Sequence, residues 1–254
     1  MLTELQFEHV HVARLEHGVA ASKASLILTA ALSQQQHRIR RFAFGDILGQ
    51  ADRPISEVLL VTGGLVSVVV DLSDGEQIET AMAGPGVAIG ASAVFGCETW
   101  LNTAVAQSAG TALSFSVSDL SAAARRDTGL QQLLFKSELW LKAQAQQSAA
   151  CNARHNIRQR VCTWLLRAHD ALQEDDVPFT QEFLAHMLGV QRERVSKIAH
   201  RMMVDEIVDY RRGHIRIDGS KLELEACECV HVLREHYKRF FAEAQAPLLL
   251  PAHP

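Results

Sequence analysis

Residues 180–203 read TQEFLAHMLGVQRERVSKIAHRMM, and this stretch decides how the rest of the chain is interpreted. Gly189 suits the positive φ that a tight turn between two helices demands. The hydroxyl of Thr180 is placed to accept a hydrogen bond from the amide of Glu182 or Phe183, and so to cap the first helix. Small or apolar residues stand where two such helices would pack, namely Ala185, Val195 and Ile198. The stretch therefore predicts a helix-turn-helix.

The second predicted helix begins near Gln191 and presents a polar face opposite its packing residues. That face carries Arg192, Glu193, Ser196 and Lys197. Arginine can donate two hydrogen bonds to guanine, and a carboxylate can accept one from cytosine N4, so Arg192 and Glu193 are predicted to read adjacent base pairs in the major groove. The alternative is an ordinary amphipathic hairpin with a solvated face. The turn glycine, the packing positions and the hairpin that follows together favour a DNA-binding helix-turn-helix over this alternative.

Residues 207–217, IVDYRRGHIRI, predict a β-hairpin with Arg212, Gly213 and His214 at its tip. A hairpin after a helix-turn-helix makes a winged helix. Contacts to phosphate fix a protein on the duplex without reading its sequence. We assign such contacts to Thr180, Gln191, Arg211, Arg212 and His214.

Composition is compatible with this interpretation. A chain of 254 residues with 48% hydrophobic and 21% charged residues is globular and long enough for two ordinary domains. The net charge of -4 argues against indiscriminate coating of nucleic acid. Residues 191–216, however, carry seven Lys or Arg against four Asp or Glu, so basic charge is local.

Neither terminus nor interior suggests a membrane. The N-terminal MLTELQFEHVHV has no cationic segment followed by an apolar run, and no apolar run approaches the ~20 residues of a membrane span. We expect a cytoplasmic protein with no membrane partner. The five cysteines are an odd number, which makes structural disulfides unexpected there.

Before the helix-turn-helix the pattern changes twice. Residues 1 to about 39 are predicted to be helical. From residue 41 to 118, short segments rich in valine, isoleucine and threonine alternate with glycines, which indicates an antiparallel barrel or jelly roll. The strand candidates are residues 58–61, 65–72, 77–82 and 112–117. The predicted fold class is α+β, with an effector roll at residues 1–127, a dimerisation helix at 128–151 and a winged helix-turn-helix domain at 152–254.

A long helix is predicted from Gly129 to about Cys151, capped by Asp127 or Thr128. Its apolar residues follow a heptad spacing, which favours a dimer axis over packing in the chain's own core. The seam residues are Leu130, Leu134 and Leu141, continued by Ala145, Ser148 and Ala149. A bend near Asn152 leads to a second helix at residues 157–172, and residues 221–241 return to helix.

This order of parts resembles the CRP/FNR superfamily of bacterial transcription regulators. The residues that carry the resemblance are PGVAIGASAVFG at 85–96, CNARHNIRQRVCTWLL at 151–166 and RERVSK at 192–197, with the wing after them. The resemblance implies homodimers on a two-fold symmetric site in double-stranded DNA, with RNA polymerase a possible partner. It also places base contacts at Arg192, Glu193, Ser196 and Lys197, and an effector cassette near Gly86, Gly90, Ala91 and Asn102.

The cassette departs from the cyclic-AMP-binding members of that superfamily. They carry a glutamate where this chain has Ala91 and an arginine near Asn102, and residues 54–124 contain no lysine or arginine. A buried phosphodiester needs a cation or a dense nest of amides. We therefore expect an unknown small-molecule effector, or none, and keep a cyclic-nucleotide-responsive regulator as the alternative.

Cofactor and metal chemistry find little support in the sequence. The iron-sulfur cluster of the oxygen-sensing members needs cysteines near the N-terminus, and the first cysteine here is Cys97. Cys227, Cys229 and His231 form a possible metal or redox patch, with 227 and 231 on one helical face. The spacing is not Cys-x-x-Cys, so we expect a packing role, no metal and no cofactor.

An enzyme built on the roll is the hypothesis from a different class. A cupin-like metalloenzyme needs histidines on neighbouring strands, and no histidine occurs between Arg38 and Arg154. No Ser-His-Asp pattern or phosphate-binding loop is present either. The chain is therefore predicted not to be an enzyme.

Overall fold

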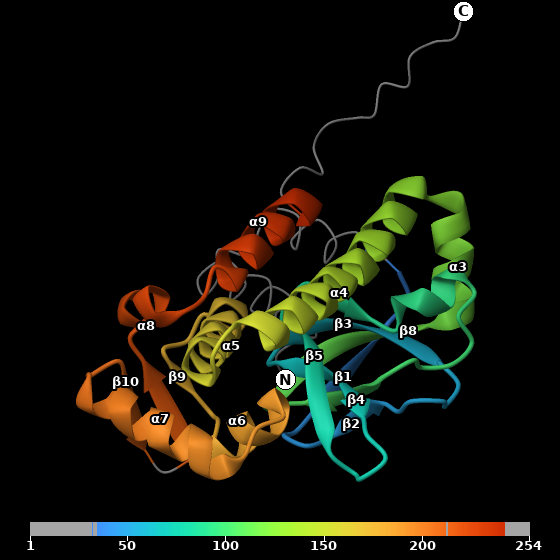
Figure 1. Ribbon diagram of the computed structural model, residues 1–254. Helices are drawn as coiled ribbons and strands as arrows, with labels where there is room; N and C mark the ends of the chain where they lie inside the picture. Colours follow the sequence, from blue (N-terminus) through green and yellow to red (C-terminus); the bar gives the residue numbers. More distant parts are fainter. Residues whose placement is uncertain (1–31, 33–34, 212, 242–254) are drawn as a thin grey trace, which may run out of the picture.

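The computed structural model describes residue 32, residues 35–211 and residues 213–241, and most of the helix expected over residues 1 to about 39 lies outside this part (Figure 1). That expectation was wrong at its end. Arg38 and Ile39 belong to strand β1, where they pair with Ser114 and Leu113. The eight strands described in the roll are β1 (Arg38–Phe42), β2 (Ile47–Gly49), β3 (Glu57–Gly63), β4 (Val66–Asp71), β5 (Gln77–Ala83), β6 (Ala88–Ile89), β7 (Thr103–Ala106) and β8 (Gly110–Ser116).

The strands form two four-stranded antiparallel sheets, which confirms the predicted roll. Their orders are β1-β8-β3-β6 and β2-β7-β4-β5. Apolar side chains from both sheets, such as Phe42, Leu59, Val66 and Ala104, pack in one buried cluster, so the sheets face each other. All four predicted strands are present as β3, β4, β5 and β8.

A short 3-10 helix, η1 (Ala91–Phe95), and helix α3 (Val117–Arg126) close the roll at one end. Helix α4 (Thr128–Arg154) follows, and Asp127 caps it by accepting hydrogen bonds from the amides of Gly129 and Leu130. In Figure 1 this long helix runs across the molecule and connects the roll to the C-terminal part.

The heptad seam of α4 faces the chain's own roll. Leu130 and Leu134 are fully buried in a cluster with roll residues. Beyond them, polar side chains bond to the roll's backbone: Ser137 accepts from the amide of Ala88, and Ser148 donates to the carbonyl of Thr80. The expectation that this seam is a dimer axis was therefore wrong for these residues, because their side chains are used inside the chain.

The side-chain amide of Gln144 joins α4 to the backbone of the roll by two hydrogen bonds. Its oxygen accepts from the amide of Met82 at 3.1 Å, and its nitrogen donates to the Met82 carbonyl at 2.9 Å. Met82 lies on β5, an edge strand of its sheet. One helical residue thus satisfies both backbone groups of one strand residue.

The C-terminal part begins after a break at His155, whose extended backbone ends α4. Its elements are α5 (Ile157–Leu172), β9 (Asp176–Val177), α6 (Gln181–Leu188), α7 (Arg192–Val204), β10 (Val208–Arg211), β11 (His214–Ile217), α8 (Gly219–Glu225) and α9 (Cys229–Phe241). Strands β10, β11 and β9 form a small antiparallel sheet. The C-terminal helix is interrupted, so Cys227 precedes α9 and does not share a helical face with His231.

The two parts share one core. Leu65, Val69 and Met82 of the roll pack in the same cluster as Trp164 and the helices of the C-terminal part. Helix α9 lies beside α4, where Tyr237 contacts Trp140 edge-on with ring centroids 5.2 Å apart (Figure 1). None of the described helices is long and apolar enough to cross a membrane.

Candidate nucleic-acid interface

The helix-turn-helix forms as its sequence predicts. The Thr180 hydroxyl accepts from the amide of Phe183 at 3.1 Å and caps α6. Gly189 ends α6 with φ 61°, and α7 starts after Gln191. Val195 is fully buried between the helices, and Ala185 is nearly so. Because the Gly189 turn and the buried Val195 fix α7 against α6, the start of α7 is held in one orientation.

Arg160 on α5 contacts the end of α6, next to the turn. Its guanidinium donates to the carbonyl of Leu188 at 2.6 Å, so it satisfies one of the carbonyls that the end of α6 leaves open. Burial lowers the pKa of Arg160. This contact ties α5 to the helix-turn-helix and was not predicted from the sequence.

The predicted face of α7 is exposed. Glu193 and Lys197 are exposed, Ser196 is half-buried, and the side chain of Arg192 is 64% exposed. Arg192 lies 3.5 Å from Glu182, and this ion pair is weak because water surrounds both groups. The charged groups at the start of α7 are therefore available to a ligand.

The same face extends one turn further than predicted. His200 is exposed and follows Ser196 and Lys197 at helical spacings of four and three residues, which place it on their side of the helix. The spacing was visible in the sequence, but we assigned no role to His200.

The wing places Arg211 and His214 beside acidic side chains. Arg211 pairs with Asp209 at 3.0 Å, and His214 lies 3.5 Å from Asp176 on β9. The side chains of Arg211 and His214 are both more than half exposed. Arg212 lies outside the described residues. The third strand, β9, holds the base of the wing through the pairing of Val177 with Ile215, and its two residues are too short a segment to recognise from the sequence.

The residues of the expected effector cassette are closely packed against their neighbours. Gly90 precedes η1 with φ 74°, and Ala91 behind it is fully buried. The amide of Ser92 donates to the carboxylate of Glu138 on α4 at 2.8 Å. Burial raises the pKa of Glu138, while its bonds to the amides of Ser92 and Ala91 lower it. An amide that could bind a phosphate thus already has a partner.

An indole occupies the space next to these glycines. Atoms of Trp100 lie 2.8 Å from where a β-carbon on Gly90 would stand, and 2.3 Å from that position on Gly49. Gly86 turns with φ 86° before β6, and Asn102 is half-buried beside β7. Arg40 on β1 and Arg167 on α5 lie outside residues 54–124, and each is paired with a glutamate inside that range, Glu57 and Glu79 respectively.

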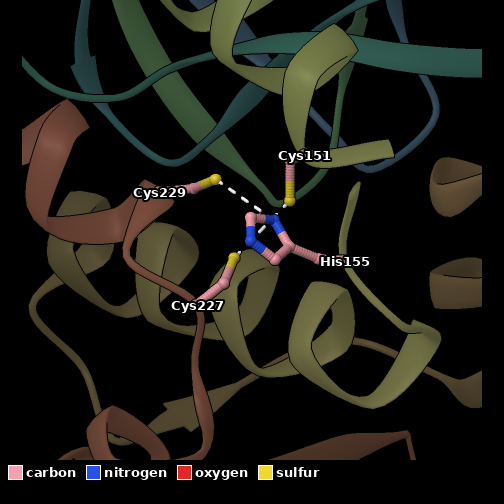
Figure 2. A group of neighbouring side chains, drawn as sticks. All are labelled: Cys151, His155, Cys227 and Cys229. Atoms are coloured by element: carbon pink, nitrogen blue, oxygen red, sulfur yellow. Dashed lines mark hydrogen bonds between the residues drawn. The ribbon is translucent and has the colours of Figure 1, made fainter. Parts of the chain in front are cut away.

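The predicted patch of Cys227, Cys229 and His231 is not assembled. His231 is exposed and lies 3.7 Å from Glu223. The two cysteines instead lie next to Cys151 and His155 at the end of α4 (Figure 2). These four residues come from two segments that are more than seventy positions apart, so no local motif could reveal them.

Two family models match the chain, in the order in which the structure places the parts. A model of the cyclic nucleotide-binding domain matches residues 39–127, and a model of the Crp-like helix-turn-helix domain matches residues 159–223. The first match covers the roll, and the second covers α5, the helix-turn-helix and the wing. No curated protein matches the sequence significantly.

Solved structures share the fold at low identity. The structure of FixK2 from Bradyrhizobium japonicum has a TM-score of 0.66 at 19% identity, with 76% of this chain and 98% of that chain covered. A transcriptional regulator of the CRP family from Thermus thermophilus gives 0.64 at 21%, covering 74% and 96%. The c-di-GMP responsive global regulator CLP from Xanthomonas campestris gives 0.62 at 13%, covering 75% and 97%.

The likeness to these structures concerns the fold, and the two family models identify both functional parts. Together they match most of the chain, with a cyclic nucleotide-binding-like roll first and a Crp-like DNA-binding domain second. The chain belongs to the CRP/FNR superfamily of transcription regulators.

Proposed function

We propose that the chain is a sequence-specific regulator that binds a two-fold symmetric DNA site as a homodimer, with α7 in the major groove of each half-site. The observation that carries this proposal is the exposed polar face at the start of α7, held by the Thr180 cap and the Gly189 turn. Arg192 and Glu193 read bases, and Ser196 and Lys197 add contacts one turn later.

Phosphate contacts surround this reading face. The side chain of Gln191 makes no capping hydrogen bond at the start of α7, so its side-chain amide can reach the phosphate backbone of the duplex. The wing supplies further cations. The residues proposed for phosphate are Thr180, Gln191, Arg211, Arg212 and His214.

The dimer uses a side of α4 that shares only Ala149 with the expected seam. Phe135 is 51% exposed, and Leu139, Lys142, Gln146 and Ala149 continue from it at alternating spacings of four and three. The face with this heptad spacing points away from the roll contacts of Ser137 and Gln144. It gives a second copy a continuous surface on the long helix.

The roll is proposed to respond to an effector other than a cyclic nucleotide, or to none. Trp100 fills space beside Gly49 and Gly90, and Glu138 occupies the Ser92 amide. A cyclic phosphodiester would have to displace that carboxylate from the Ser92 amide, which is costly. The domains are proposed to divide at residues 127/128 and 151/152, with the chain acting in the cytoplasm, as a regulator and not an enzyme. RNA polymerase remains a candidate partner.

Selection of duplexes from a random DNA pool tests this proposal. The purified chain is incubated with the pool with and without cyclic AMP, at two salt concentrations. We expect enrichment of a palindrome without cyclic AMP, and weaker retention at higher salt because counterions are released on binding. Enrichment that depends on cyclic AMP would contradict the effector proposal, and an enriched site without two-fold symmetry would contradict the dimer.

A further inference from the structure

Four side chains of metal-ligating type converge where α4 ends and α9 begins (Figure 2). Cys151 lies in the last turn of α4, and His155 is the residue that ends this helix. Cys227 lies in the turn before α9, and Cys229 is its first residue. One ligand atom from each, three sulfurs and a ring nitrogen, all lie within 4.8 Å of one another.

The separations match the edges of a small tetrahedron. The sulfurs of Cys151 and Cys227 are 3.6 Å apart, and the sulfur of Cys229 is 3.5 Å from Nδ1 of His155. A tetrahedral Zn²⁺ ion with ordinary bond lengths holds two sulfurs about 3.8 Å apart and a sulfur and a nitrogen about 3.6 Å apart. An iron-sulfur cluster spreads its ligands over several metal atoms and needs a wider arrangement.

The surroundings support the ligands as they do in metal sites. Nε2 of His155 lies 3.1 Å from a carboxylate oxygen of Glu228, which leaves Nδ1 to face the sulfurs. A ligating histidine usually pairs its second nitrogen with a carboxylate in this way, which fixes the ring. Two further donors face the sulfurs: Gln147 Nε2 is 3.0 Å from Cys229, and Thr163 Oγ1 is 3.0 Å from Cys227.

The cysteines are shielded from water. Cys151, Cys227 and Cys229 are all buried and form a cluster of their own. Buried cysteines can also pack as small apolar side chains. Simple packing would not require a histidine held by a carboxylate and aimed at the sulfurs.

We propose that Cys151, His155, Cys227 and Cys229 bind one Zn²⁺ ion through three sulfurs and one nitrogen. Four protein ligands leave no open position, so the site is structural. The ion joins the end of the long helix to the start of α9, directly beside the break that leads into the DNA-binding part. This proposal replaces the expectation of no metal, and it does not depend on DNA binding.

Metal analysis of the full-length protein tests the site. Chain purified under reducing conditions is expected to hold one zinc per chain. Cys151→Ser, Cys227→Ser and His155→Ala should each lower zinc retention at least tenfold. The matched controls are Cys97→Ser, a cysteine outside the cluster, and His231→Ala, the histidine that the sequence alone suggested. Both controls should retain zinc, and equal zinc in Cys227→Ser and the original chain would overturn the proposal.

A cobalt titration needs no variant and so is independent of folding defects. The chain is stripped of metal with a chelator under reducing conditions and then titrated with Co²⁺. We expect saturation at one ion per chain, with thiolate-to-cobalt charge transfer and the strong visible bands of tetrahedral cobalt. A weak octahedral spectrum without charge transfer would overturn the site. The readout involves no DNA, so it is separate from failure of the proposed regulator.

Discussion

The carboxylate of Glu79 on β5 accepts a hydrogen bond from the indole Nε1 of Trp164 on α5 at 3.0 Å. The Glu79 side chain is only 1% exposed, and Arg167 lies 3.6 Å away. Ser67 on the neighbouring strand also donates to this carboxylate. One buried acid thus joins the roll to the DNA-binding part.

This junction predicts a pH dependence of stability. Burial raises the pKa of Glu79 to about 7 from an ordinary 4.5, against the lowering effects of Arg167, Ser67 and Trp164. Since the folded chain holds this proton more tightly than the unfolded chain, the free energy of unfolding contributed by Glu79 falls as pH rises from about 4.5 to 7. The loss is up to about 3 kcal/mol. Denaturant unfolding of Glu79→Gln across this range should lack the fall, whereas Glu98→Gln, an exposed glutamate, should keep it. An unchanged pH profile in Glu79→Gln would contradict the assignment.

Base readout by Glu193 predicts a change in specificity. Glu193→Ala should lose about 1–3 kcal/mol on the selected palindrome and relax the preference at one base pair per half-site. Titration of labelled duplexes with single substitutions measures both effects.

Arg211 provides the matched comparison for phosphate contacts. Arg211→Ala should weaken specific and random duplexes alike, and should reduce the salt slope of binding by roughly one. If Glu193→Ala behaved in the same uniform way, Glu193 would not read a base.

The zinc proposal predicts that metal removal destabilises the chain. Chelation should lower the free energy of unfolding by about 3 kcal/mol or more, or the melting temperature by roughly 6–12 °C, because binding energy is released only in the folded state. Differential scanning calorimetry with and without chelator measures the shift. Cys227→Ser should melt low in both conditions and should not respond to the chelator.

The turn glycine of the helix-turn-helix makes a further prediction. Gly189→Ala should cost about 1–2 kcal/mol for the left-handed backbone alone. A new β-carbon would also stand 2.5 Å from Cδ1 of Ile78 on β5. Gly75→Ala is the control, since Gly75 has φ 88° with open space around it. Denaturant unfolding should show a larger loss of stability for Gly189→Ala than for Gly75→Ala. If the contact with Ile78 causes the difference, Ile78→Val should reduce the loss at Gly189, because valine lacks the Cδ1 atom.

The local parts of this structure were predictable from the sequence, and the contacts between distant segments were not. The helix-turn-helix could be predicted from Thr180, Gly189 and Val195, because caps, turns and packing positions depend on neighbours a few residues away. The seam of α4 was recognised as apolar, but a heptad spacing cannot say which surface it meets. Leu130 therefore packs on the roll, where we expected a second chain.

The same limit applies to the metal site and the junction acid. The spacing of Cys227 and Cys229 drew attention to a metal, but their partners come from the end of α4 and only the fold brings them near. From the sequence alone, Glu79 is one polar residue within a predicted strand. Its burial depends on α5, which packs over it from a later part of the chain.

The double hydrogen bond between Gln144 and Met82 has a consequence for solubility. An exposed edge strand offers unpaired amides and carbonyls to strands of other molecules, and so invites aggregation. Gln144 satisfies both groups of Met82, and Ser148 satisfies the carbonyl of Thr80 on the same strand. The long helix thus acts as a protective cover over the open edge of β5, and any motion that lifts it away would uncover an adhesive strand.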